Sequence, residues 1–367
     1  MAELKIYTNK IQENIRTLSS YFREKGIQWS LVTKVFSGDK EFLKNVLTQE
    51  VIDEIYSIGD SRLTSLKNLK AVNPEMRTIY IKPPAKIYAS EVVRYADISL
   101  NSSFSTIKAL NEEARKQGKV HQIIIMIELG ELREGVKRSD IMAFYEKVFD
   151  LPNIEVIGLG SNLGCMYGIE PTYDKLLQLS LYKELISARF QKELSLVSGG
   201  TSITLPLIEN KTVPKEINHF RVGEAAFFGL SPLNNEKFIN LNTDTFEFQA
   251  NIIELEEKKI IPDGVISDGH VGQTAELTEE DVSQTSYKAI LDFGLLDLDK
   301  EDIESTDPDL TFVGITSDMI VVDIGKNRDG KGKVRYQIGD KISFKPNYMA
   351  VARLLNSKFI DKVFINS

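Results

Sequence analysis

The sequence has one cysteine, three histidines and no long apolar segment, and these scarcities exclude several classes of protein. A lone Cys165 cannot form a disulfide within the chain, which is typical of proteins in the reducing cytosol. The longest apolar runs, at 123–127 and 319–322, are far too short to span a bilayer, and the charged first residues do not resemble a secretion signal. The sequence therefore predicts a soluble cytoplasmic protein.

Positive charge is scarce only in the last third of the chain. The net charge of the 367 residues is -8, which argues against nucleic acid as a partner. Residues 236–367 hold 25 acidic and 15 basic side chains, whereas residues 1–235 hold 28 and 30. The change falls at 231–236, a Pro- and Asn-containing stretch that is typical of a turn or linker. We therefore predict two domains, 1–235 and 236–367.

Short β-branched runs alternate with helical periodicity in the first domain. The predicted strands are 29–35, 51–58, 77–82, 96–101, 122–129, 154–161, 194–200 and 220–225, and residues 103–119 and 172–190 are predicted helices. Eight strands with intervening helices predict an α/β fold, a (β/α)8 TIM barrel, whose functional groups follow the strands. In the second domain, runs at 246–255, 286–294, 310–318, 319–324 and 333–344 predict a smaller, mostly β structure.

Two charged side chains follow predicted strands and have an ordinary interpretation as well as a chemical one. Lys34 ends the first run, where a lysine is usually a surface charge but can form a Schiff base if it has suitable partners. Arg133 follows the fifth run, where Glu131 and Glu134 could simply be its ion-pair partners in a solvated turn. Neither residue identifies a function alone.

Glycines and hydroxyls follow the last two predicted strands. Residues 198–202 read Ser-Gly-Gly-Thr-Ser, and Gly223 lies in 221–224; both stretches offer backbone N–H groups to an anion, although a tight turn would look similar. Barrels of this kind often bind phosphate after strands seven and eight. A phosphate site together with the Lys34 amine predicts pyridoxal 5′-phosphate as cofactor.

The chain resembles the alanine racemase superfamily of pyridoxal-phosphate enzymes, and within it most resembles the ornithine racemase branch. The matching segments are LVTKVFSGD (31–39), DSRLTSLKNLK (60–70), ADISLNS (96–102), VHQIIIMIELGELREG (120–135), GLGSNL (158–163), LVSGGTS (196–202), FRVGEAAFFG (220–229) and GITSDMIVVD (314–323). They occur in the family's order. The resemblance implies a barrel followed by a β domain, and a homodimer in which each active site borrows residues from the partner's β domain.

The resemblance also implies roles for individual residues. Lys34 would carry the cofactor and act as the base on one face of it. Arg221 would face the pyridine nitrogen, where a permanent charge disfavours ring protonation and so favours racemisation. Arg133 would lie near the ring hydroxyl and the substrate carboxylate. The other residues expected at the cofactor are Asn162, Ser198, Gly200, Thr201, Ser202, Gly223, Glu224 and Tyr348.

The second base that racemisation requires on the opposite face has no assignment from the resemblance. Alanine racemases supply a tyrosine from the partner subunit, but the comparable stretch here, 264–273, has none. His270 and Asp268 are the candidates within it, although His270 could be an ordinary loop residue. Tyr348 is a third candidate, and could instead reach the phosphate or be a packed aromatic residue.

The predicted function is racemisation of an amino acid, with ornithine or another basic amino acid as substrate. Residues 292–309 are strongly acidic and form either a solvated loop or, like Asp268, a site for a substrate's side-chain ammonium. Alternatives are an alanine or broad-spectrum racemase, a non-catalytic pyridoxal-phosphate carrier, and a metal-dependent D-amino-acid lyase. The lyases need a late His/Cys metal pair, which is absent after His270, and the carriers lack a second domain.

The remaining histidines and the cysteine have structural interpretations. His121 opens a predicted strand and His219 precedes Arg221, so both are expected to be structural, and no metal site is predicted. Cys165 is expected to be a small buried side chain.

Overall fold

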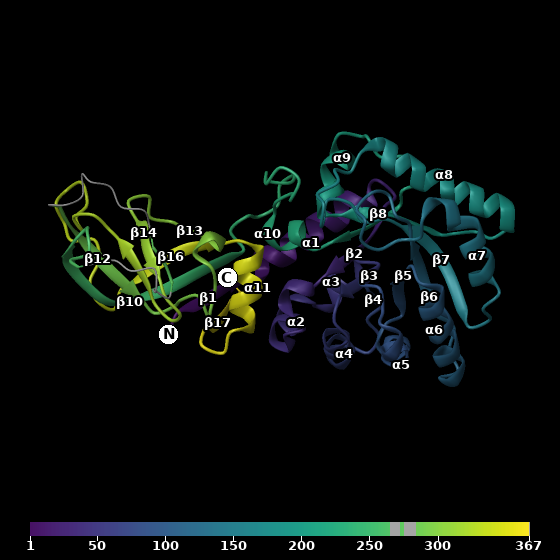
Figure 1. Ribbon diagram of the computed structural model, residues 1–367, viewed down its shortest axis with the longest axis horizontal. Helices are drawn as coiled ribbons and strands as arrows, with labels where there is room; N and C mark the ends of the chain where they lie inside the picture. The colour runs from purple at the N-terminus through teal and green to yellow at the C-terminus, as the bar shows by residue number, and fades with distance from the viewer. Residues whose placement is uncertain (265–271, 275–283, 367) are drawn as a thin grey trace. The chain divides into compact units, whose positions relative to one another are not determined.

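The computed structural model describes residues 1–264, 272–274 and 284–366 (Figure 1). In this part of the chain no helix combines the length and the apolar character needed to cross a membrane.

The chain forms two compact units that differ from the predicted domains at both ends. One unit is Asn9–Thr243, and the other combines Met1–Thr8 with Asp244–Ser367. The division therefore lies after Thr243 and not after residue 235. The first eight residues join the C-terminal unit because their strand pairs there, and such long-range pairing leaves no local signal in a sequence.

The unit Asn9–Thr243 is a closed barrel of parallel strands, which confirms the predicted TIM barrel (Figure 1). Each strand pairs with the next, and pairing of the last with the first closes the barrel. The strands are β2 (Gln28–Val32), β3 (Ser57–Asp60), β4 (Thr78–Tyr80), β5 (Ile98–Asn101), β6 (His121–Met126), β7 (Ile154–Gly160), β8 (Leu196–Thr201) and β9 (His219–Val222).

Helices connect these strands, as the alternation in the sequence predicts. The helices are α1 (Thr8–Arg23), α2 (Lys40–Val46), α3 (Gln49–Asp53), α4 (Leu63–Val72), α5 (Ala89–Tyr95), α6 (Phe104–Lys116), α7 (Ile141–Phe149), α8 (Tyr173–Phe190), α9 (Leu205–Glu209) and α10 (Glu224–Phe228). Short 3-10 turns are η1 (Lys34–Phe36), η2 (Lys86–Tyr88), η3 (Arg138–Asp140) and η4 (Ser202–Thr204). The helices predicted at 103–119 and 172–190 are confirmed as α6 and α8.

The strand predicted over 51–58 is wrong in its first half, which is helical. The side chain of Thr48 accepts a hydrogen bond from the backbone N–H of Val51 and so caps α3. Only Ser57–Asp60 forms a strand. A run this short, with several β-branched residues, fits either structure, and the preceding cap decides the outcome.

Apolar side chains from five strands, β4 to β8, form one buried cluster. Its members are Ile79, Ile98, Leu100, Ile124, Met126, Ile157 and Leu196. Residues on strands that do not pair can meet only across the interior of a closed barrel, so this cluster fills the interior. Alternate residues of each strand share a face, so Ser198, two residues after Leu196, also faces inward.

The second unit is built on a mostly antiparallel sheet, which confirms the predicted β domain. Among the described residues its strands are β1 (Glu3–Tyr7), β10 (Phe246–Lys259), β11 (Gln273–Thr274), β12 (Thr285–Leu291), β13 (Ile303–Ser305), β14 (Thr311–Ile315), β15 (Ile320–Asp323), β16 (Lys341–Pro346) and β17 (Asp361–Ile365). The 3-10 turn η6 (Lys300–Asp302) and the helix α11 (Tyr348–Asn356) complete it. Of the strand predicted over 333–344, only the end is β structure.

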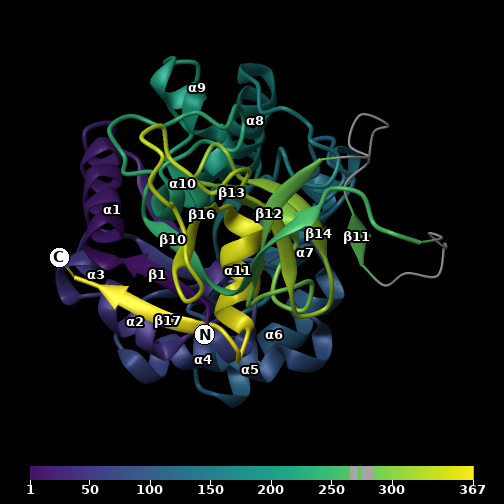
Figure 2. The same cartoon turned by 90° about the vertical axis from the view of Figure 1, so that its left-hand side faces the viewer.

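The sequence analysis did not predict β1, which holds both ends of the chain in this sheet. It lies between β10, to which it pairs antiparallel, and β17, to which it pairs parallel (Figure 2). Leu4 and Ile6 alternate with half-buried residues and are fully buried. This alternation over Glu3–Tyr7 was the available signal, but a strand of five residues is too short to be distinctive.

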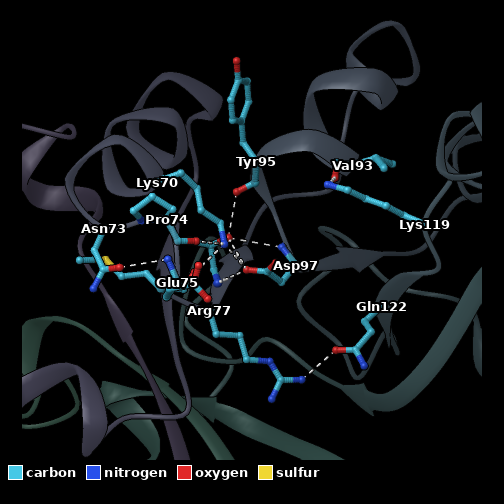
Figure 3. Close-up of polar contacts among 12 residues, drawn as sticks. Lys70, Asn73, Pro74, Glu75, Arg77, Val93, Tyr95, Asp97, Lys119 and Gln122 are labelled. Atoms are coloured by element: carbon cyan, nitrogen blue, oxygen red, sulfur yellow. Dashed lines mark hydrogen bonds and ion pairs between the residues drawn. The ribbon is translucent and has the colours of Figure 1, made fainter. Parts of the chain in front are cut away.

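A charged cluster ties together the loops at the amino-terminal ends of β4 and β5, opposite the end where the site lies. Lys70 Nζ donates to Asp97 Oδ2 at 2.7 Å and to the carbonyl of Met76 at 2.6 Å (Figure 3). The same Asp97 oxygen accepts from the backbone N–H and hydroxyl of Thr78, at 2.7 and 3.0 Å. Burial would raise the pKa of Asp97, but these hydrogen bonds hold it below its usual value.

We predict that Asp97→Ala lowers the free energy of unfolding by about 1–3 kcal/mol, because the buried N–H of Thr78 loses its partner. Equilibrium denaturation measures the change. The contribution of Asp97 is complete above the usual carboxyl pKa and is lost as the pH falls through the lowered value. Glu112→Ala, at an exposed position of α6, is the control; equal effects of the two substitutions would contradict the assignment.

Candidate active site

An amine and a carboxyl group follow the carboxyl ends of two adjacent strands and interact electrostatically. Lys34 begins η1 directly after β2, and Glu224 begins α10 directly after β9. Burial raises the pKa of Glu224, and the Lys34 ammonium opposes this rise. The pairing of β2 with β9 closes the barrel, so closure brings these two groups together.

Arg221, on β9, carries its charge in a buried position and has neutral hydrogen-bond partners. Only 3% of its surface is exposed. Its Nη2 donates to the carbonyl of Ser161 at 2.8 Å and to Asn162 Oδ1 at 3.3 Å, and its Nη1 donates to Ser198 Oγ. Burial lowers the pKa of Arg221 to about 10, so the guanidinium remains charged at neutral pH.

Asn162 and Glu134 connect Arg221 to Arg133. Asn162 accepts from Arg221 through its oxygen and donates to Glu134 Oε1 at 3.1 Å through its nitrogen. Arg133 Nη2 donates to the same Glu134 oxygen at 2.5 Å. The predicted pairing of Arg133 with Glu134 is therefore confirmed. Glu134 lies between the two cations and is attracted to both.

The loops after β8 and β9 lie close to one another. Ser202 Oγ accepts from the backbone N–H groups of Gly223 and Ala225, at 3.3 and 3.2 Å. A Cβ at Gly223 would lie 2.8 Å from the carbonyl oxygen of Val32, so only glycine fits there. A Cβ at Gly200 would lie 2.3 Å from Thr204 Oγ1, and the φ of Gly200 is +142°. Thr201 ends β8 beside them.

Two buried hydroxyls near these loops have no hydrogen-bond partner among the described residues. They are Thr204 Oγ1, in η4 after β8, and Ser161 Oγ, directly after β7. Buried polar atoms rarely stay unsatisfied, since each one costs the free energy of its lost hydration. A polar ligand bound at this end of the barrel would supply the missing partners.

Glu131 has a role that the sequence analysis missed. Its carboxylate is 2% exposed and accepts from the backbone N–H groups of Cys165, Tyr167 and Ile169, at 3.0, 3.1 and 2.9 Å. Burial would raise the pKa of Glu131, but these N–H groups lower it. Glu131 therefore anchors the loop after β7 and does not form the suggested ion pair with Arg133. No local sequence pattern predicts this role, because the amides it binds are distant in sequence.

The interpretation of Cys165 as a buried packing residue is wrong. Cys165 is exposed, and its Sγ accepts a hydrogen bond from Arg133 Nη1. The backbone of its loop is held by Glu131, which leaves the side chain outside the core.

The other predicted site residues belong to the second unit or lie outside the described part of the chain. Asp268 and His270 fall in 265–271, which the structure does not describe. Tyr348 begins α11 of the β unit. Within 292–309, Asp292 accepts from Asn251 at 2.7 Å, Asp302 pairs with Arg353, and Asp307 pairs with Arg335 and Tyr336. These carboxylates therefore stabilise the β unit itself.

His121 and His219 are both buried, as their structural interpretation predicts. Within the described ranges, no three His, Cys, Asp or Glu residues are grouped so that they could hold a metal ion.

We predict that Glu131→Ala releases the loop after β7. Hydrogen exchange of the amides of Cys165, Tyr167 and Ile169 should accelerate by about 10-fold or more, because each amide loses its acceptor. Glu170→Ala, an exposed substitution in the same loop, should leave these rates within about 2-fold of wild type. Unchanged protection in the Glu131 variant would show that the carboxylate does not anchor the loop.

Comparisons with known proteins agree with the geometry. A family model described as "Alanine racemase, N-terminal domain" matches residues 6–232. The ornithine racemase of Acetoanaerobium sticklandii is 32% identical over 361 residues, which cover 98% of each chain. The lysine racemase of Thermotoga maritima is 28% identical over the same length and coverage.

A solved structure has the same fold over the whole chain. The alanine racemase of Bartonella henselae, determined with covalently bound pyridoxal phosphate, superimposes with a TM-score of 0.74 at 17% identity and covers 99% of both chains. The match of the family model to more than half of the chain, and a curated relative above 30% identity over nearly its full length, lead to one assignment. The chain belongs to the alanine racemase family.

Proposed function

We propose that this protein is a pyridoxal-phosphate-dependent racemase of basic amino acids, with ornithine as the first substrate to test. The observation that carries the proposal is the buried guanidinium of Arg221, which donates hydrogen bonds to neutral oxygens. Arg221 lies on β9, and the amine of Lys34 follows the neighbouring strand β2. The similarity to an ornithine racemase and a lysine racemase supports the substrate class. The bound pyridoxal phosphate of the Bartonella relative supports the cofactor.

The residues at the carboxyl end of the barrel fit this cofactor. Lys34 offers the amine that binds the aldehyde. Ser202, Thr204 and the close-packed backbone at Gly223 would hold the phosphate, and the unsatisfied Thr204 Oγ1 would gain a partner there. Arg221 would face the pyridine nitrogen. When bound, the cofactor withdraws electrons from the substrate Cα and so acidifies its proton.

Lys34 is the acid and base on one face of the substrate in this proposal. It removes the Cα proton as a neutral amine and returns one as an ammonium. The Glu224 carboxyl interacts with the Lys34 ammonium. Glu134 orients the guanidinium of Arg133 by accepting from Nε and Nη2, and Arg133 binds the substrate carboxylate through its remaining N–H groups.

Arg221 separates racemisation from other reactions of the same cofactor. A nearby permanent cation disfavours a proton on the ring nitrogen. More negative charge then stays at Cα after its proton is removed, and the proton returns to Cα. Among the described residues Arg221 donates only to neutral oxygens, so none of their carboxylates cancels its positive charge by direct contact.

Inversion needs a second acid or base on the opposite face, and we propose His270 or Asp268 for this role. We also propose a homodimer, as in the family that the sequence resembles, in which the partner's β unit completes each site. A basic substrate would find a negative partner among the acidic side chains of that unit, with Asp268 as the first candidate.

Lys34→Ala tests the proposal directly. Purified wild-type protein should show a visible absorption band that borohydride removes, and should interconvert D- and L-ornithine and lysine on chiral chromatography. The Lys34 variant should lose the band and at least about 10³-fold in kcat, because both the attachment point and the base are gone. Lys40→Ala, at an exposed lysine in α2, should retain both. A wild-type protein without the band, or with no interconversion, would overturn the proposal.

A further inference from the structure

A second buried chain of hydrogen bonds starts at Arg221 and runs away from the site. Arg221 Nη1 donates to Ser198 Oγ, and Ser198 Oγ lies 2.9 Å from His219 Nδ1. His219 Nε2 lies 2.9 Å from Ser30 Oγ, which lies 2.7 Å from Ser57 Oγ. The chain thus crosses four strands of the barrel wall, β8, β9, β2 and β3. All four serine and histidine side chains are buried.

The direction of these hydrogen bonds follows from the groups at one end. A guanidinium has donors only, so Ser198 Oγ must accept from Arg221. The single hydroxyl proton of Ser198 is then left to be donated, and the His219 tautomer with a free lone pair on Nδ1 is the one that accepts it. A neutral imidazole that accepts at Nδ1 carries its proton on Nε2 and donates to Ser30. Ser30 can in turn donate to Ser57.

The surroundings of His219 keep the ring neutral, as this direction requires. His219 is fully buried, and the cations that face it are Arg221 on its own strand and Arg77 just before β4. Burial, with smaller contributions from these two charges, lowers the pKa of His219 to about 3. The ring of Tyr56, which precedes β3, packs edge-on against it with centroids 5.6 Å apart.

We propose that His219 is a positioning residue for the racemase reaction and that it acts on Arg221 through Ser198. By accepting the hydroxyl proton of Ser198, His219 turns the oxygen lone pairs of that serine toward the guanidinium and fixes the direction of its Nη1. Without this acceptor the serine can rotate, and the guanidinium loses one of the contacts that aim it. This inference rests on the proposed function, since it needs Arg221 to face the cofactor nitrogen.

Four variants of the holoenzyme separate positioning from simple core packing. His219→Leu should lower kcat by about 10-fold or more and leave KM for ornithine within about 2-fold, since small displacements of a positioned group slow chemistry. It should also raise the yield of 2-oxo acid per racemisation event, because a displaced Arg221 no longer keeps the ring nitrogen unprotonated. His219→Asn retains an acceptor near the Nδ1 position and should recover most of the loss in both measurements.

His121→Leu is the matched control. His121 is also a buried barrel histidine that bonds to a serine, Ser99, at 2.8 Å, and burial lowers its pKa to about 4. Within the described part of the chain, no hydrogen bond connects His121 or Ser99 to Arg221, so this variant should keep the wild-type ratio of racemisation to oxo-acid formation. Equal ratios for His219→Leu and His121→Leu, or no recovery in His219→Asn, would overturn the proposal. Ser198→Ala removes the same link and should behave as His219→Leu does.

Nitrogen NMR of the cofactor-free, ¹⁵N-labelled protein gives a readout that does not depend on activity. The chain has three histidines, so the His219→Asn spectrum assigns the ring directly. We expect a neutral ring protonated at Nε2 from pH 6 to 8, a range that lies above its lowered pKa. A proton on Nδ1 would overturn the proposal even in an active racemase. Absence of racemisation with the Nε2 form present would contradict the proposed function but leave the hydrogen-bond chain intact.

Discussion

The rest of the site depends on the burial of one permanent charge, that of Arg221. A guanidinium cannot lose its proton at neutral pH, so its donors must all find acceptors once it leaves water. Those acceptors come from the loop after β7 and from β8, and they reach Arg221 because β8 pairs with β7 on one side and with β9 on the other. Asn162 and Ser198 thus both accept hydrogen bonds from Arg221. Asn162 is also hydrogen-bonded to Glu134, and Ser198 to His219, so the orientation of Arg221 depends on these two residues as well.

The choice of neutral acceptors over a carboxylate has a functional consequence. A buried cation paired directly with a carboxylate would present little net charge to a ligand. Glu134 instead forms an ion pair with Arg133, and Asn162 lies between Glu134 and Arg221. The negative charge of Glu134 therefore acts on both cations but contacts only Arg133. In the proposed function, this leaves the positive charge of Arg221 to act on the cofactor nitrogen. Among the described residues, the buried hydroxyls of Ser161 and Thr204 at the same end of the barrel have no partner and could bond to a polar ligand there.

The residues at strand ends were predictable from the sequence, but their hydrogen-bond partners on distant parts of the chain were not. Lys34 and Arg133 lie at or after the ends of predicted strands and Arg221 lies within one, so their places could be inferred from local pattern and resemblance. Glu131 was placed in an ion pair because Arg133 is its neighbour in sequence, whereas its partners are 34 to 38 residues away. The same limit explains β1, whose partners begin near residue 246, and His219, whose partner Ser30 is 189 residues distant.

The central claim is that these groups direct the cofactor toward proton exchange at Cα. Incubation of the wild-type protein with L-ornithine in D₂O, followed by chiral separation and mass spectrometry, tests it most directly. The account predicts D-ornithine that carries deuterium at Cα, progress toward equal amounts of the two enantiomers, and almost no 2-oxo acid. Oxo acid as the main product, or deuterium exchange in L-ornithine without inversion, would contradict it.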